Sequence, residues 1–104
     1  AGKFPVWLSP VQVKVLPVSD KYLPYGEKVM ADLKSRNIRV EMDGRNEKLG
    51  YKIREARLEK VPYMLIVGEK EQENGTETVR CRDAEEGKQD LGEMGVEEFV
   101  GMLN

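Results

Sequence analysis

Apolar and polar residues follow one another along the chain in patterns that predict its secondary structure. The segment 11–18, VQVKVLPV, is rich in β-branched residues and predicts a first strand. Pro17 lies at the end of this strand, where a missing N–H group is tolerated. Apolar residues then recur at helical spacing. Pro24 and Gly26 fall in the first turn of this helix, so 27–35 is its better-defined part.

The middle of the chain predicts a strand, a helix and another strand. The segment 38–42, IRVEM, alternates apolar and polar residues, which indicates a strand near the edge of a sheet with one buried face. Asn46 can cap a helix over 47–60. The continuous apolar run VPYMLIVG at 61–68 predicts a central strand that is buried on both faces. The expected core stripe of the helix is Leu49, Ile53 and Ala56.

The last third of the chain begins with a turn signal. The dipeptide Asn74-Gly75 is typical of a two-residue β-hairpin turn, so strands are expected on both sides of it, as far as about Arg82. A short strand over 90–94 and a closing helix over 95–103 follow. The inward side chains of that helix are expected to be Val96, Phe99, Val100 and Leu103.

The predicted element order is β-α-β-α-β-β-β-α, within a single domain over 1–104. Strands that alternate with helices imply parallel pairing and right-handed crossovers, and the hairpin adds antiparallel strands. The fold class is therefore α/β with a mixed sheet. Hydrophobic residues make up 39% and charged residues 35% of the chain, which suits a well-solvated domain with one core. No apolar run approaches the ~20 residues of a membrane span.

The predicted hairpin would bring a carboxylate and a guanidinium together. Alternation places Glu71 and Arg80 on one face as diagonal neighbours, with Val79 and Cys81 on the core face. A carboxylate can accept hydrogen bonds from the Watson–Crick edge of guanine, and a guanidinium can donate to base carbonyls or phosphates. The residues alone leave open a simple exposed salt bridge, worth about 0–1 kcal/mol.

Charge is unevenly distributed although the formal net charge is only −2. Six basic and three acidic residues lie in 45–60, whereas six acidic residues and one lysine lie in 85–98. This asymmetry indicates a polyanionic partner on one side of the domain. A solvated helix face with ordinary ion pairs, such as Lys48 with Glu55, is the alternative. Gly50 allows either close packing within the chain or the close approach of RNA.

Several catalytic chemistries lack their residues. The chain has no histidine, which excludes a Ser-His-Asp triad and imidazole metal ligands, and its one cysteine, Cys81, permits no internal disulfide. No phosphate-binding glycine loop is present. We therefore expect a binding domain without catalytic residues, a metal or a cofactor. The first residues, AGKFPVWL, do not resemble a signal peptide, and the start without Met suggests a piece of a longer protein.

Three segments resemble one protein family. These are FPVWLSPVQVKVLPVSD at 4–20, DGRNEKLGYKIREARLEKVPYMLIVGEKE at 43–71 and TVRCRDAEEGKQDLGEMGVEEFV at 78–100. In this order they are similar to the C-terminal anticodon-binding domain of bacterial-type threonyl-tRNA synthetases. The acidic insertion at 83–89 departs from the family pattern and could alter the loop beside Arg80 and Arg82.

The resemblance implies a mixed five-stranded sheet with three helices, attached to a class II catalytic domain in the same chain. It implies a larger cytoplasmic, homodimeric enzyme that joins threonine to tRNA using ATP, with its ATP, Mg and Zn sites in other domains. Threonine codons require an anticodon ending in G and U, so these bases are the expected targets. The expected base-contacting residues are Asn46, Lys60, Glu71 and Arg80, and the expected backbone contacts are Lys48, Lys52, Arg54 and Arg82.

Other functions remain open at this stage. The anticodon domains of prolyl-, histidyl- and glycyl-tRNA synthetases share the fold and parts of the pattern. A protein-interaction domain of the same fold without RNA binding is a second alternative. A small-molecule enzyme on a doubly wound sheet is disfavoured, since histidine and a phosphate loop are missing.

Overall fold

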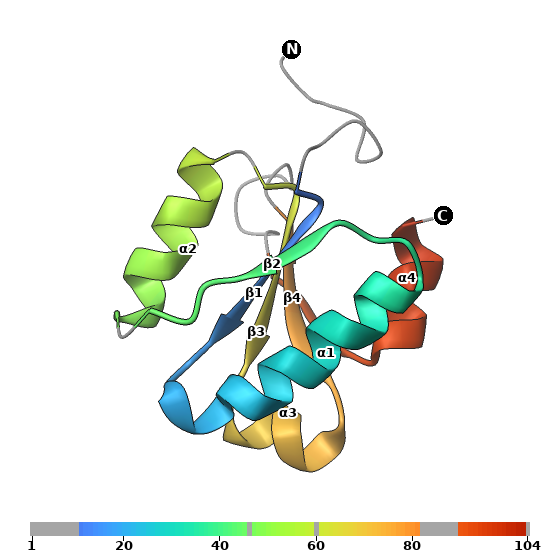
Figure 1. Ribbon diagram of the computed structural model, residues 1–104, viewed down its shortest axis with the longest axis horizontal. Coiled ribbons are helices and arrows are strands. Elements are labelled where there is room, and N and C mark those ends of the chain that lie inside the picture. Colours follow the sequence, from blue (N-terminus) through green and yellow to red (C-terminus); the bar gives the residue numbers. More distant parts are fainter. Residues whose placement is uncertain (1–10, 46, 60, 82–89, 104) are drawn as a thin grey trace.

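The computed structural model of the protein describes residues 11–45, 47–59, 61–81 and 90–103. Five strands form one mixed sheet in the order β2-β1-β3-β4-β5 (Figure 1). The first strand pairs in parallel with its two neighbours, whereas β4 is antiparallel to both β3 and β5. The strands are β1 (Val13–Pro17), β2 (Val40–Met42), β3 (Tyr63–Val67), β4 (Glu77–Cys81) and β5 (Asp90–Met94).

The described helices connect and cover these strands (Figure 1). None of them combines the length and apolar composition that crossing a bilayer requires. They are the 3-10 helix η2 (Asp20–Tyr22) and the α-helices α1 (Leu23–Ser35), α2 (Leu49–Leu58), α3 (Glu69–Asn74) and α4 (Val96–Leu103).

The predicted α/β fold with a mixed five-stranded sheet is confirmed, with β2 at an edge and β3 in the centre. The first helix includes the turn that contains Pro24 and Gly26. Proline at the start of a helix lacks an N–H group that would be unpaired anyway. A Cβ atom at Gly26 would lie 2.8 Å from Met42 Sδ and 3.3 Å from Pro17 Cγ. Glycine therefore lets α1 lie directly against β1 and β2.

The predicted hairpin at Asn74-Gly75 is wrong. The segment before it is the helix α3, so the observed order is β-α-β-α-β-α-β-β-α. Its sequence, EKEQEN, consists mainly of good helix formers. Gly75 has a φ angle of 68°, and its N–H donates to Glu71 O, which is how glycine ends a helix. An Asn-Gly pair is suited both to a hairpin turn and to a helix C-terminus, and the preceding residues decide between them.

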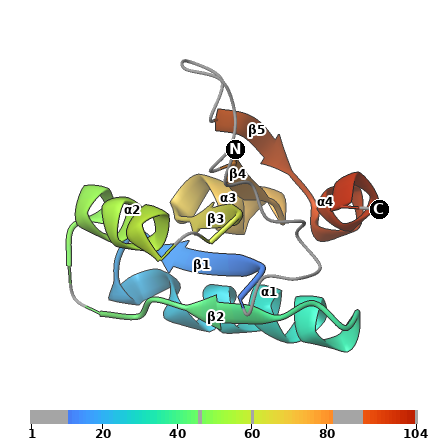
Figure 2. The same cartoon turned by 90° about the horizontal axis from the view of Figure 1, so that it is seen from above.

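Two hydrophobic clusters lie on opposite faces of the sheet. Alternating residues of β1 point to opposite sides, because successive side chains of a strand do so. One cluster joins Val13 and Val15 to α1 and α4, where Phe99 is fully buried. The other joins Leu16 to α2. Figure 2 shows α2 and α4 on opposite sides of the sheet.

The predicted core stripe of α2 is confirmed. Ala56 is fully buried in the second cluster, and the partly buried Leu49 and Ile53 pack against it. Two lysine contacts add to this small apolar interface. Lys52 is only 2% exposed, and its Nζ donates to Pro17 O at 3.0 Å. At the other end of the helix, Lys14 Nζ lies 2.9 Å from Glu59 Oε1. These contacts fix α2 over β1.

A carboxylic acid is buried on the face of the sheet that carries the first hydrophobic cluster. Glu77 is fully buried beside Val79, and neither of its carboxyl oxygens has a hydrogen-bond partner within the described residues. Burial, with a smaller contribution from the charge of Asp32, raises the pKa of Glu77 from 4.5 to about 8. The folded domain therefore holds this side chain protonated at neutral pH.

The first prediction concerns Lys52. Replacement by Met keeps the aliphatic stem but leaves Pro17 O without its donor, so we expect Lys52→Met to lower the free energy of unfolding by about 1–3 kcal/mol. Urea unfolding measures this loss. The matched control is Lys48→Met, since Lys48 is exposed at the start of the same helix, and its effect should stay within about 0.5 kcal/mol. Equal effects of the two changes would contradict the structural role of Lys52.

The second prediction concerns pH. In the unfolded chain Glu77 ionises near pH 4.5, whereas the folded state keeps the proton until about pH 8. The unfolded state thus loses its proton first, and stability falls as pH rises through this window. Relative to Glu77→Gln, the unaltered protein should lose up to about 1.4 kcal/mol per pH unit between pH 5 and 8. Urea unfolding at several pH values measures the difference. Glu73→Gln, at an exposed site, should show no such slope.

Candidate nucleic-acid interface

Helix α2 covers only part of its side of the sheet. Ile66 and Met64 of β3 belong to the cluster under α2. Their partners on β4 are Thr78 and Arg80, so both of these side chains lie on the same side of the sheet as α2. Thr78 in turn pairs with Glu93 of β5. A polar surface therefore continues from the edge of α2 across β4 to β5. We call Glu71, Thr78, Arg80 and Glu93 the β4 surface.

Glu71 joins this surface from α3. Its Oε2 accepts a hydrogen bond from Thr78 Oγ1 at 2.7 Å. A Cβ atom at Gly68 would lie 3.1 Å from Glu71 Oε1, so glycine leaves space for the carboxylate. Arg80 is the next residue of β4 on the same face as Thr78. The structure thus brings Glu71 and Arg80 to one face as expected, but through a helix that folds back to β4 and not across a hairpin.

Glu93 provides a second carboxylate beside the first. Its Oε1 accepts hydrogen bonds from Thr76 Oγ1 at 2.7 Å and from Asn74 Nδ2 at 2.9 Å. These two bonds, with the nearby charge of Lys70, hold the pKa of Glu93 below its usual range. Glu93 was not predicted as a site residue, because in the sequence it is one of six acidic residues within 85–98. The position of Glu93 within the predicted strand 90–94 does not reveal which strand pairs with it.

Arg80 offers an unused donor. The Nε atom is buried without a hydrogen-bond partner, and no carboxylate among the described residues forms an ion pair with this guanidinium. A buried donor without an acceptor costs about 1–3 kcal/mol. Such a group in a folded protein calls for an explanation, such as a functional role or a bound ion or water that supplies the acceptor.

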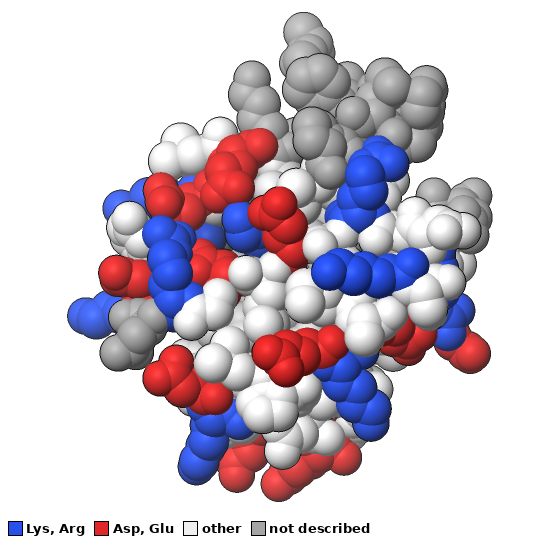
Figure 3. All heavy atoms as spheres, in the orientation of Figure 1, with Lys and Arg blue, Asp and Glu red and all other residues white. Residues whose placement is uncertain are grey.

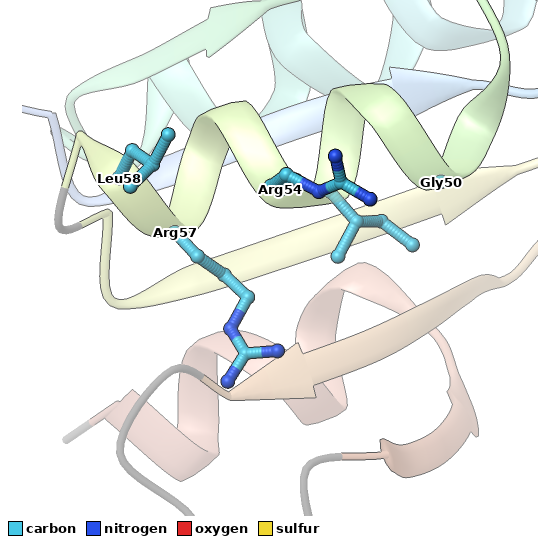
Figure 4. Close-up of a pocket in the computed structure, with 5 residues that line it drawn as sticks. Gly50, Arg54, Arg57 and Leu58 are labelled. Carbon is cyan, nitrogen blue, oxygen red and sulfur yellow. The ribbon is translucent and has the colours of Figure 1, made fainter.

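A pocket lies along one flank of α2, next to the core stripe. Its volume is about 370 Å³. Figure 4 shows the side chains of Arg54 and Arg57 extending from the same side of the helix, with Gly50 one turn before Arg54. The lining residues recur at the i, i+3, i+4, i+7 and i+8 positions of one helix stripe. They are Gly50, Ile53, Arg54, Arg57 and Leu58.

The expected backbone contacts have different positions in the structure. Lys48 and Arg54 are exposed, and Arg54 lines the pocket. Lys52 was expected on the surface, and this is wrong, because its ammonium is buried against Pro17 O, where no phosphate can reach it. The length of the lysine side chain explains why the prediction failed. A lysine beside the core stripe can extend inward and donate to a carbonyl oxygen of the sheet. Asn46, Lys60 and Arg82 lie outside the described residues.

Other basic side chains near α2 are neutralised within the chain. Arg45 binds Asp43 through its Nε at 2.9 Å and its Nη2 at 2.7 Å, and this pair lowers the pKa of Asp43. The same guanidinium lies 5.4 Å from the ring centre of Tyr51 and 3.5 Å from Glu55. In the alternative interpretation of this helix, Glu55 would pair with Lys48, but in the structure it pairs with Arg45. Among the described residues near α2, only a few basic side chains are therefore left without an acidic partner.

Charge is mixed over the view that has α1 in front. On the face that carries α1, basic and acidic side chains are interspersed (Figure 3). This face provides no broad surface of one sign. The side with α2 and β4 instead combines two carboxylates that accept hydrogen bonds with guanidinium groups that donate them. Carboxylates can recognise the N–H groups of a guanine edge, and guanidinium groups can bind phosphates or base carbonyls. This arrangement suits unpaired RNA bases, whose edges are accessible.

Known proteins with similar sequences point in the same direction. The threonine–tRNA ligase of Clostridioides difficile is 55% identical over 104 residues, and that of Acetivibrio thermocellus is 57% identical over 103 residues. These alignments cover 100% and 99% of this chain but only 16% of each relative. The chain thus spans about one sixth of the length of these relatives.

A solved structure is also similar in fold. It is described as the RNA binding domain of threonyl-tRNA synthetase from Cryptosporidium parvum, and it superimposes with a TM-score of 0.89 at 33% identity. The match covers 98% of this chain and 25% of that chain. The family model described as the anticodon binding domain matches residues 12–104, nearly the whole of this sequence. The chain belongs to the anticodon-binding domain family.

Proposed function

We propose that this chain recognises the anticodon of threonine tRNA as part of a threonine–tRNA ligase. The observation that carries the proposal is that Glu71 of α3 joins Thr78 and Arg80 on the face of β4 that lies on the α2 side of the sheet. A carboxylate held by a threonine hydroxyl lies on the same face as a guanidinium whose Nε lacks an acceptor. The similarity to threonine–tRNA ligases supports the choice of tRNA.

The roles of the residues follow from their chemistry. Glu71 accepts hydrogen bonds from the guanine of the anticodon, and Arg80 donates to a base carbonyl or a phosphate. Asn46 and Lys60, which precede and follow α2 in the sequence, are the other proposed base contacts. Lys48, Arg54 and Arg82 are the proposed contacts to the RNA backbone. Lys52 is left out of this set because it is buried.

The proposed mechanism is differential binding. The anticodon loop binds tightly only when its bases satisfy the polar groups of the β4 surface, because a wrong base leaves those groups unpaired. In the longer protein, this binding places the far end of the tRNA at a catalytic domain of the same chain. We propose that the longer protein is a cytoplasmic homodimer that attaches threonine to tRNA using ATP. The groups expected for that reaction, ATP, Mg and Zn, belong to its other domains.

The third prediction tests base recognition. Glu71→Gln keeps a partner for Thr78 but replaces one acceptor oxygen by a donor amide. It should weaken binding of a threonine-tRNA anticodon stem-loop by about 1–3 kcal/mol. It should have little effect on a stem-loop in which the recognised G is replaced by A. Titration followed by fluorescence anisotropy measures both. Stem-loops of proline, histidine and glycine tRNAs serve as competitors and separate the related synthetases.

The matched control for this test is Glu73→Gln, on the same short helix at an exposed position. It removes the same charge and should leave both affinities unchanged. Equal weakening of the G and A stem-loops by Glu71→Gln would contradict base recognition by this residue. No binding of any stem-loop by the unaltered chain would contradict the RNA function itself.

The fourth prediction tests a backbone contact. Lys48→Ala should weaken all stem-loops alike and reduce the slope of log affinity against log salt concentration by about 0.7, the value for one phosphate of a single strand. Binding measured at four salt concentrations gives the slope. Lys28→Ala, which removes an exposed lysine from α1, should leave the slope unchanged. If both variants change the slope equally, the effect is one of net charge and not of a contact at Lys48.

A further inference from the structure

We propose that the pocket on α2 holds one unpaired RNA nucleotide of any base. Its base lies against the helix backbone at Gly50, and its phosphate binds Arg54 and Arg57. This inference rests on the proposed function and extends it. It gives Gly50 and Arg57 roles in binding, and it adds a contact that does not depend on sequence beside the base-specific contacts of the β4 surface.

Gly50 is the first observation. It lies in the first turn of α2, and glycine is a poorer helix former than alanine. Its φ angle is not among the positive ones, so its backbone does not require glycine. A Cβ atom built at Gly50 meets no atom of the described residues within 4 Å, in contrast to Gly26, which packs against Met42. Packing within the described chain therefore does not explain this glycine. A flat ligand that approaches the helix backbone does explain it.

Unpaired charge is the second observation. Arg54 and Arg57 are both exposed, and neither forms an ion pair with a carboxylate in the part of the chain that the structure describes. Arg36 and Arg45, by contrast, bind Asp32 and Asp43. Three residues along a helix correspond to about 4.5 Å, so Arg54 and Arg57 can bind the same phosphate or two adjacent ones. Planar guanidinium groups also stack on bases.

The shape and lining of the pocket are the third observation. Its volume of about 370 Å³ lies in the range of small-molecule sites. Ile53 and Leu58 provide an apolar lining, and Leu58 is 71% exposed, which is unusual for a large apolar side chain without a partner. Among the described residues, the lining contains no carboxylate or amide side chain that could select one base edge. Stacking and phosphate contacts accept every base, so the pocket suits a nucleotide whose identity is not checked.

The pocket and the β4 surface lie on the same side of the sheet. Lys52, two residues after Gly50, binds Pro17, and Pro17 pairs with Val67 at the end of β3. The chain then enters α3, which carries Glu71. The Gly50 end of the pocket therefore lies toward the same end of the sheet as Glu71. One RNA loop can occupy the pocket and the β4 surface together, which favours RNA over an unrelated acidic peptide.

The experiment fills the pocket without removing a contact of the fold. Gly50→Met places a side chain in open space on a helix and replaces glycine by a better helix former, so the midpoint of thermal unfolding should stay or rise. Affinity for the threonine-tRNA stem-loop should nevertheless fall by roughly tenfold, as expected for one lost stacking contact. The loss should be equal for the G and A stem-loops. Gly50→Ala should show the same stability gain with a smaller loss of affinity.

Two matched controls complete the test. Gly101→Met makes the same change at an exposed helical glycine of α4 that also has open space around it, and it should not alter RNA binding. Arg57→Gln should reduce the salt slope by about 0.7, whereas Arg36→Gln, which removes the same charge from the C-terminal end of α1, should not.

The outcomes separate the two proposals. If Gly50→Met binds RNA as tightly as the unaltered chain while Glu71→Gln still loses selectivity for G, the pocket is not a nucleotide site but the anticodon proposal stands. If Gly50→Met affects only the G stem-loop, the pocket contributes to base recognition and the sequence-independent role is wrong. If the unaltered chain binds no stem-loop, both proposals fail.

Discussion

Two lysine contacts fix α2 on the sheet, and the candidate interface depends on them. Lys52 donates to Pro17 O from the inner side of the helix, and Lys14 binds Glu59 at its end. Both contacts fix the helix over β1. The apolar contacts between them are few, because Ala56 and its neighbours form only a narrow stripe. With α2 in this place over β1, none of the described helices covers the face of β4 that carries Thr78 and Arg80, and both side chains are partly exposed.

One face of β4 thus belongs to the hydrophobic core, whereas the other belongs to the candidate interface. On the side of α1 and α4, Val79 and the protonated Glu77 are buried, and the strand is part of the main core. The α2 side of the sheet carries Thr78 and Arg80, and α2 itself has two exposed arginines without an ion pair to any described residue. A chain with a net charge of −2 cannot hold RNA by its overall charge. Guanidinium groups without an ion-pair partner in the described part of the chain, on the same side of the sheet as carboxylates that are held by hydrogen bonds, provide the specific alternative.

Much of the fold could be predicted from local patterns. The central strand β3 was predictable because a strand that is buried on both faces needs an uninterrupted apolar run. The core stripe of α2 was predictable from helical spacing alone. The helix α3 was not predicted, since Asn74-Gly75 is compatible with two structures, and only the whole segment with its contacts distinguishes them. Glu77 also follows no local rule, because a charged residue on an alternating strand is normally expected to face solvent.

The sequence by itself determined the mixed α/β class, the order of the main strands along the chain and the family resemblance, because periodicity and motifs are local properties of the chain. It also identified Glu71 and Arg80 as partners on one face, although for a geometric reason that is wrong. Only the tertiary structure decided that Lys52 is buried, that Glu93 lies beside Thr78 and that Gly50 faces open space. Each of these depends on which distant segment lies opposite a residue, and neither propensity nor spacing encodes that contact.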